Sequence, residues 1–183
     1  NMKKAEHDLS KPERLGSCGR PAPWVHLELM DQDNKPVPKG EPGEICVRAP
    51  LVMKEYKDMP EQTAEAFAGG WMHTGDIGRM DEDGFLYIVD RTKDMIVTGG
   101  FNVFPREVED VLATHKAVGQ VAVIGVPDEN WGEAVKAVIV LKPDTEAGAN
   151  LVEELKTLVK DMKGSVQSPK SIDFVDAIPL TPV

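Results

Sequence analysis

The hydrophobic pattern of this chain changes once, in the charged segment Asp90-Arg91-Thr92-Lys93-Asp94. Before this segment, short apolar stretches alternate with turns rich in Gly and Pro, a pattern typical of strands in a small barrel or sandwich. After it, strand-like runs are interleaved with stretches of helical period. We therefore predict an α+β fold, in which short strands of a barrel-like subdomain are followed by a small α+β domain.

The first part contains three stretches that predict strands. In residues 24–29, Val25, Leu27 and Leu29 fall on one face, and residues 44–48 alternate in the same way. Residues 84–89 are apolar throughout, so we expect that strand to be buried on both faces.

The second part is expected to contain one short strand and three longer ones, at residues 95–97, 121–126, 134–141 and roughly 171–175. One helix is expected to begin at Pro105, because the first turn of a helix does not use the backbone N–H that proline lacks. A second helix has Asn150 as its cap and Glu153 three residues later, as in a capping box. Gly164 is placed to end it in the left-handed conformation. These elements predict a roughly three-stranded sheet with two covering helices.

Composition excludes several classes of function. The 183 residues carry a net charge of −10, and an acidic surface repels phosphate backbones, so nucleic acid is not an expected partner. The apolar runs are far shorter than the roughly 20 residues that span a bilayer, so no transmembrane segment is expected. The two cysteines, Cys18 and Cys46, do not form a disulfide framework or a metal-ligand spacing. This pattern favours a reducing, cytoplasmic location.

Three short segments could carry chemistry, and each also has a purely structural interpretation. In Thr74-Gly75-Asp76, the carboxylate could bind both hydroxyls of a ribose, or the segment could be a surface turn closed by a side-chain bond. Arg91 could contact a phosphate or a ribose, or belong to a solvated charge cluster. The pair Gly99-Gly100 could let an extended ligand approach the backbone, or form an ordinary turn between a strand and a helix.

Five segments in this order and spacing resemble the adenylate-forming enzymes, which include acyl-CoA synthetases, peptide-synthetase adenylation domains and firefly-type luciferases. The sequences of these segments are most similar to those of fatty-acid–CoA ligases. The segments are Gly43-Glu44-Ile45, Gly70-Trp71-Met72-His73-Thr74-Gly75-Asp76, Tyr87-Ile88-Val89-Asp90-Arg91-Thr92-Lys93-Asp94, Gly99-Gly100-Phe101-Asn102-Val103-Phe104-Pro105 with Glu107-Val108-Glu109, and Ile178-Pro179-Leu180-Thr181-Pro182.

The resemblance implies a reaction in two steps. A fatty or other carboxylic acid attacks ATP to give an acyl-adenylate and pyrophosphate, and the thiol of coenzyme A then displaces AMP; Mg²⁺ assists in the complete enzyme. It also implies roles for single residues. Asp76, Arg91 and Thr74 would contact the nucleotide, Lys93 would be the hinge of a rotating C-terminal domain, and Gly99 and Gly100 would line the pantetheine tunnel.

The resemblance further implies a division of the chain. Residues 1–90 would be the tail of a large N-terminal domain, residues 91–93 the hinge, and residues 94–183 the C-terminal lid domain. The family's phosphate loop and its Tyr-Gly-x-Thr-Glu segment are absent, and its catalytic lysine is expected just beyond Val183, for which Lys170 is no substitute. We therefore expect a fragment that depends on an upstream domain, is inactive alone and carries no catalytic residue.

Two alternatives stay open at this point. The parent could be an adenylation domain that loads a carrier protein instead of free coenzyme A. The chain could also be a non-enzymatic α+β binding module. The acyl pocket of the family lies outside these residues, so the sequence does not predict the chain length of the acid.

Overall fold

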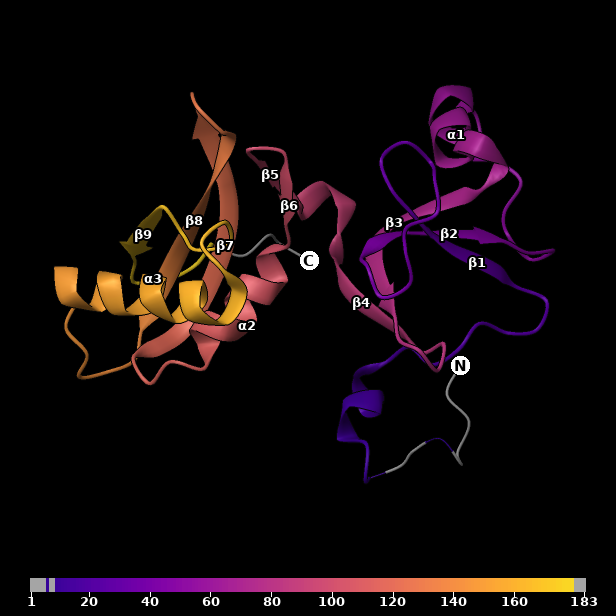
Figure 1. Ribbon diagram of the computed structural model, residues 1–183. Helices are drawn as coiled ribbons and strands as arrows, with labels where there is room; N and C mark the ends of the chain where they lie inside the picture. The colour runs from indigo at the N-terminus through magenta and orange to yellow at the C-terminus, as the bar shows by residue number, and fades with distance from the viewer. Residues whose placement is uncertain (1–5, 7–8, 180–183) are drawn as a thin grey trace. The chain divides into compact units, whose positions relative to one another are not determined.

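The computed structural model describes residue 6 and residues 9–179. The chain divides into two compact units, Asn1–Lys93 and Asp94–Val183, and each is described by itself (Figure 1). The last motif, Ile178 to Pro182, falls partly outside the described residues, since Leu180 to Val183 are not among them.

Unit 1 is built on one antiparallel sheet. Its strands are β1 (His26–Met30), β2 (Gly43–Arg48), β3 (Met72–Met80) and β4 (Leu86–Arg91), paired in the order β1-β2-β3-β4. The connection from β2 to β3 holds helix α1 (Pro60–Ala66) and the short turn η3 (Ala68–Gly70). Two further short turns, η2 (Pro12–Gly16) and η4 (Thr92–Asp94), lie before β1 and after β4. The core of this sheet is small, with Leu29, Ile45 and Leu86 buried together.

Strand β4 is not buried on both faces, so the expectation for residues 84–89 is wrong. Ile88 is 50% exposed, although Phe85 and Leu86 are buried. β4 is the last strand of the described sheet and pairs with one strand, β3. On its other side Gly19 bridges it at Leu86, and Ile88 lies beyond this bridge. Phe85 is instead covered by the guanidinium groups of Arg14 and Arg20, at 4.9 and 4.4 Å from its ring centre.

The described residues of unit 2 form a five-stranded sheet and two helices, which confirms the α+β class. Its elements are β5 (Ile96–Thr98), β6 (Phe101–Val103), α2 (Pro105–Ala113), β7 (Val118–Asp128), β8 (Gly132–Leu141), α3 (Ala149–Lys163) and β9 (Ser171–Phe174). The order is β6-β5-β8-β7, and β9 pairs with β8 in parallel. The three longer strands are those expected from the sequence, while β6 was not expected.

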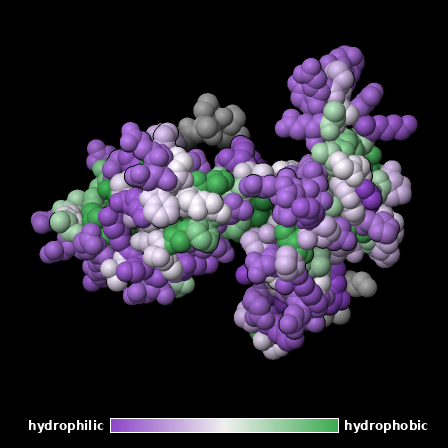
Figure 2. Space-filling model, turned by 45° about the horizontal axis from the view of Figure 1, so that its top comes forward, coloured by the Kyte–Doolittle hydropathy of each residue, from purple (hydrophilic) through white to green (hydrophobic). Residues whose placement is uncertain are grey.

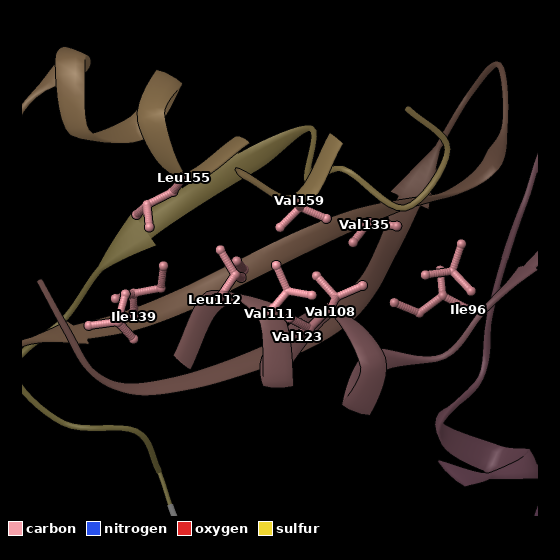
Figure 3. Packing of buried hydrophobic residues seen from close by; sticks show 12 residues of the cluster. Ile96, Val108, Val111, Leu112, Val123, Val135, Ile139, Leu155 and Val159 are labelled. Atoms are coloured by element: carbon pink, nitrogen blue, oxygen red, sulfur yellow. The ribbon is translucent and has the colours of Figure 1, made fainter. Parts of the chain in front are cut away.

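The core of unit 2 lies between its sheet and its helices. Val108, Val111 and Leu112 of α2 and Leu155 and Val159 of α3 pack on buried residues of the sheet (Figure 3). Apolar residues at helical spacing therefore face the core from both helices, as predicted, except that Met162, also expected on the inner face of α3, is 59% exposed.

The start of α3 differs from the expectation. Gly148 occupies the cap position and Asn150 lies within the helix, where its side chain caps nothing. At the other end Gly164 follows the helix with a φ of 93°, positive as expected.

Hydrophilic residues cover most of the surface that Figure 2 shows. None of the described helices combines the length and the apolar character that crossing a membrane requires.

Candidate functional site

Asp76 and Arg91 lie opposite each other in neighbouring strands of unit 1. They are register partners of β3 and β4, and Nε of Arg91 is 3.9 Å from Oδ1 of Asp76. The side chains are 42% and 64% exposed. A pair that is this open and this long contributes little to stability. The carboxylate and the guanidinium are therefore free of a tight mutual bond and accessible to a ligand.

Both side chains line a pocket of about 930 Å³ that lies wholly within unit 1. This volume is near the upper end of the range for small-molecule sites, roughly 300–1,000 Å³. One wall comes from strands β2, β3 and β4 and another from α1 and the loop before it. The lining residues are Glu44, Tyr56, Met59, Gln62, Glu65, Ala66, His73, Thr74, Gly75, Asp76, Arg91, Thr92 and Lys93.

The Thr74-Gly75-Asp76 segment is held by local bonds. The Thr74 hydroxyl accepts a hydrogen bond from the Asp76 N–H at 3.2 Å, and Gly75 has a φ of 75°. The Gly75 N–H donates to Oε1 of Glu44 at 3.0 Å. A local side-chain bond is thus present, as the sequence suggested, but the segment lies within strand β3 and not in a surface turn. The bond fixes the backbone that carries the Asp76 carboxylate into the pocket.

Glu44, Cys46 and His73 form a second cluster beside this segment, which reasoning from the sequence missed. Nδ1 of His73 lies 2.8 Å from Oε2 of Glu44 and 3.4 Å from Sγ of Cys46. Cys46 is fully buried, and burial, reinforced by the nearby Glu44 carboxylate, raises the pKa of its thiol to about 12. Cys46 and His73 are direct partners across β2 and β3. The register that joins them depends on distant residues, so no local motif marks the cluster.

Lys93 is the last residue of unit 1 and also lines the pocket. It lies in the short turn η4 and is exposed. Four of the six residues selected from the sequence, Thr74, Asp76, Arg91 and Lys93, therefore meet at one pocket. The hinge role of Lys93 stays a prediction.

Gly99 and Gly100 belong to unit 2. They form the two-residue turn of the β5–β6 hairpin, in which Thr98 pairs with Phe101. Their φ values, 56° and 82°, are both positive, as in the type I′ turns that suit tight hairpins. A Cβ at Gly99 would overlap the ring of Trp131, whereas a Cβ at Gly100 would meet no atom within 4 Å. Gly100 is thus the open side of the turn.

Two family models match this chain. The AMP-binding enzyme model matches residues 5–57, and the AMP-binding enzyme C-terminal domain model matches residues 107–183. Together they cover parts of both units, and neither includes the pocket residues between positions 73 and 93.

The similarity to known proteins also covers the pocket residues. The chain is 54% identical over 184 residues to the medium/long-chain-fatty-acid–CoA ligase FadD8 of Mycobacterium tuberculosis (strain ATCC 25618 / H37Rv), which covers 98% of this chain and 32% of that protein. It is 39% identical over 168 residues to the fatty acid–[acyl-carrier-protein] ligase ScoC of Streptomyces coeruleorubidus, covering 92% of this chain and 32% of the other. Among solved structures, the amide bond synthetase McbA from Marinactinospora thermotolerans matches with a TM-score of 0.81 and 40% identity, over 98% of this chain and 36% of its own. The chain thus spans about a third of the length of these relatives.

Proposed function

Because this chain belongs to the AMP-binding, adenylate-forming enzymes, we propose that it is part of an ATP-dependent acyl-CoA ligase that acts on a fatty or related carboxylic acid. The likeness to the FadD8 ligase over 98% of the chain supports this activity. The observation in the structure that carries it is the pocket in which Asp76 and Arg91 lie side by side and accessible.

In this proposal Asp76 binds the ribose of ATP. A carboxylate can accept hydrogen bonds from two neighbouring hydroxyls at once, and the pair of ribose hydroxyls offers this arrangement. Arg91, across the strand pair, supplies a fixed positive charge toward the ribose or the α-phosphate. Thr74 mainly holds the backbone of Asp76 in place, since its hydroxyl already accepts a hydrogen bond from the Asp76 N–H.

The reaction joins two displacements. An oxygen of the substrate carboxylate attacks the α-phosphorus of ATP, the bond to the β-phosphate oxygen breaks, and pyrophosphate leaves. The sulfur of coenzyme A then attacks the acyl carbon of the adenylate, and AMP leaves with the bonding electrons. Between these steps a domain formed by residues 94–183 would rotate about residues 91–93 and bring Gly99 and Gly100 to the pantetheine arm. Residues 1–90 would be the end of the large N-terminal domain.

Magnesium does not fit the cluster of three ligands that the described residues form. That cluster contains a thiol and an imidazole, whereas Mg²⁺ prefers oxygen ligands in octahedral geometry. We therefore assign no step of this chain to Mg²⁺. Both cysteines are free thiols, which supports the proposal of a reducing, cytoplasmic setting.

A carrier protein is the second candidate acceptor. The similarity to ScoC, a ligase named for an acyl carrier protein, favours this alternative specifically. The two candidates share the adenylation step and the pocket of unit 1. They differ in whether the attacking thiol belongs to free coenzyme A or to a carrier-bound pantetheine.

The test is ATP-dependent thioester formation by the complete gene product. It is supplied with ATP, Mg²⁺ and fatty acids of graded chain length, and offered either coenzyme A or a pantetheinylated carrier protein. We expect pyrophosphate release with fatty acids and thioester formation on coenzyme A. Preference for the carrier would select the alternative, and no acid-dependent pyrophosphate release would remove both.

The 183-residue chain by itself is expected to be inactive. Electrostatic stabilisation is usually the largest contribution to catalysis, and this chain lacks the family's phosphate loop and spans about a third of its relatives. The measurement is pyrophosphate release from ATP by the isolated chain, with the complete gene product as positive control. Acid-dependent turnover by the isolated chain would show that it contains a full catalytic site.

A further inference from the structure

Three side chains with different donor atoms converge on the sheet of unit 1. Cys46 of β2 and His73 of β3 are direct partners across the strands, and Glu44 lies two residues before Cys46. The thiol, the imidazole and the carboxylate each place one donor atom within 4.8 Å of the other two. Cys46 is buried, and the side chains of His73 and Glu44 are partly buried, at 14% and 19% exposure.

The hydrogen bonds of His73 indicate which ring nitrogen faces the cluster. Nε2 lies 3.2 Å from the carbonyl oxygen of Ala68. A carbonyl only accepts hydrogen bonds, so the tautomer that fits this contact carries its proton on Nε2. Nδ1 then faces Oε2 of Glu44 at 2.8 Å and Sγ of Cys46 at 3.4 Å. This is the arrangement of metal-bound histidines, whose second nitrogen commonly donates to a backbone carbonyl.

In the tautomer that donates from Nε2, the lone pair of Nδ1 points toward Oε2 of Glu44 at 2.8 Å. A cation placed among the three donor atoms would bind all of them.

We propose that Glu44, Cys46 and His73 form a binding site for Zn²⁺ or a similar divalent transition-metal cation. Thiolate, imidazole and carboxylate are the ligands that Zn²⁺ takes in proteins, with bonds of about 2.0–2.3 Å. In a tetrahedral site such bonds put ligand atoms roughly 3.3–3.8 Å apart. The sulfur–nitrogen distance of 3.4 Å already fits this geometry, and the shorter nitrogen–oxygen distance has to widen.

The pocket supplies the fourth position. Glu44 and His73 both line it, so a water molecule can reach a cation held by the three side chains, as in zinc sites with three protein ligands. Binding displaces the thiol proton. Oε1 of Glu44 stays available to the Gly75 N–H. The site does not depend on the proposed ligase activity.

The test is Co²⁺ binding to the untagged, fully reduced 183-residue chain, without nucleotide. A Co²⁺ ion bound to a thiolate gives a charge-transfer absorption in the near ultraviolet. We expect one Co²⁺ per chain with this absorption, and its loss when Zn²⁺ is added. Cys46→Ser should abolish the absorption, and His73→Gln should weaken binding at least tenfold.

Unit 2 offers a matched control. His115 and Glu154 form a similar histidine–glutamate pair, with Nε2 and Oε1 3.0 Å apart, but no cysteine belongs to that unit. His115→Gln and the exposed-thiol variant Cys18→Ser should therefore bind Co²⁺ like the parent.

Several results would overturn the proposal. These are the absence of thiolate absorption in the parent chain, unchanged binding in both Cys46→Ser and His73→Gln, or equal weakening in the two control variants. Circular dichroism checks the fold of each variant. If Cys46→Ser does not fold, the parent spectrum and the His73→Gln titration decide the matter.

Discussion

At the scale of single residues, the nucleotide proposal depends on how Asp76 is held. Its backbone N–H is tied to Thr74 and the neighbouring Gly75 N–H to Glu44, while its carboxylate stays 42% exposed in the pocket. The backbone is thus ordered before a ligand arrives, and the functional group is not consumed by an internal bond. Preorganisation of this kind lowers the cost of binding.

Asp76→Ala in the complete enzyme should raise the KM for ATP roughly ten- to a hundredfold. The estimate follows from losing a charge-assisted hydrogen bond worth about 1.5–3 kcal/mol, with each 1.4 kcal/mol corresponding to about a tenfold change. Pyrophosphate exchange at varied ATP concentration measures the effect. Asp33→Ala, which removes an exposed turn carboxylate paired only with Lys35 at the surface, serves as the control. Equal ATP kinetics in the two variants would remove Asp76 from the site.

At the scale of elements, the two glycines of the β5–β6 hairpin look equivalent in the sequence but differ in their surroundings in the structure. Both have positive φ, but only Gly99 lies under the Trp131 ring. Gly100→Ala should cost about 1–2 kcal/mol for the left-handed backbone alone, and Gly99→Ala more, because it adds the overlap with the ring. Chemical denaturation of the 183-residue chain measures both. Trp131→Ala should reduce the excess cost of Gly99→Ala, and an unchanged excess would contradict the packing argument.

The contact between the end of α2 and helix α3 predicts a pH dependence. The hydrogen bond from His115 lowers the pKa of Glu154 below its ordinary value of 4.5. A carboxyl group whose pKa is lower in the folded state stabilises the fold above its ordinary pKa. That contribution is lost as the pH falls through the lowered value. The difference in melting temperature between the parent and Glu154→Gln should therefore be largest near neutral pH and shrink below pH 4.5. A difference that grows with acidity would contradict this sign.

The elements also show what the sequence could and could not predict. Apolar spacing predicted both helices of unit 2 and its three longer strands, because the period of a pattern is a local property. The cap of α3 was assigned to Asn150 where Gly148 stands, since helix ends are sensitive to the surrounding loop. The exposure of Ile88 was missed because it depends on β4 lying at a sheet edge, which is a non-local property.

The same distinction applies to the pocket. Thr74, Asp76 and Arg91, which line it, were selected because their segments resemble those of a known family. Glu44, Cys46 and His73 were not, because only the pairing of β2 with β3 brings them together. A strand register is fixed by the whole sheet, so side chains that meet across strands leave no signature in either strand alone.

At the scale of the whole molecule, the proposal of a rotating domain is based on the division of the chain between Lys93 and Asp94. The change of pattern in the sequence and the two compact units fall at the same place in the chain. Hinges are a few residues that absorb large changes in φ and ψ. Proline fixes φ near −65° and restricts the residue before it, so it tests a hinge by limiting the rotation of the backbone.

Lys93→Pro in the complete enzyme should separate the two half-reactions. Pyrophosphate exchange reports adenylation, and coenzyme A capture of a supplied acyl-adenylate reports thioester formation. We expect the second rate to fall much further than the first, because the rotation that brings Gly99 and Gly100 to the thiol is needed only for thioester formation. Lys93→Ala, which removes the exposed side chain and leaves the backbone free to rotate, should preserve this second rate. Equal losses in both half-reactions for Lys93→Pro would indicate misfolding, and no loss in either would exclude Lys93 as the hinge.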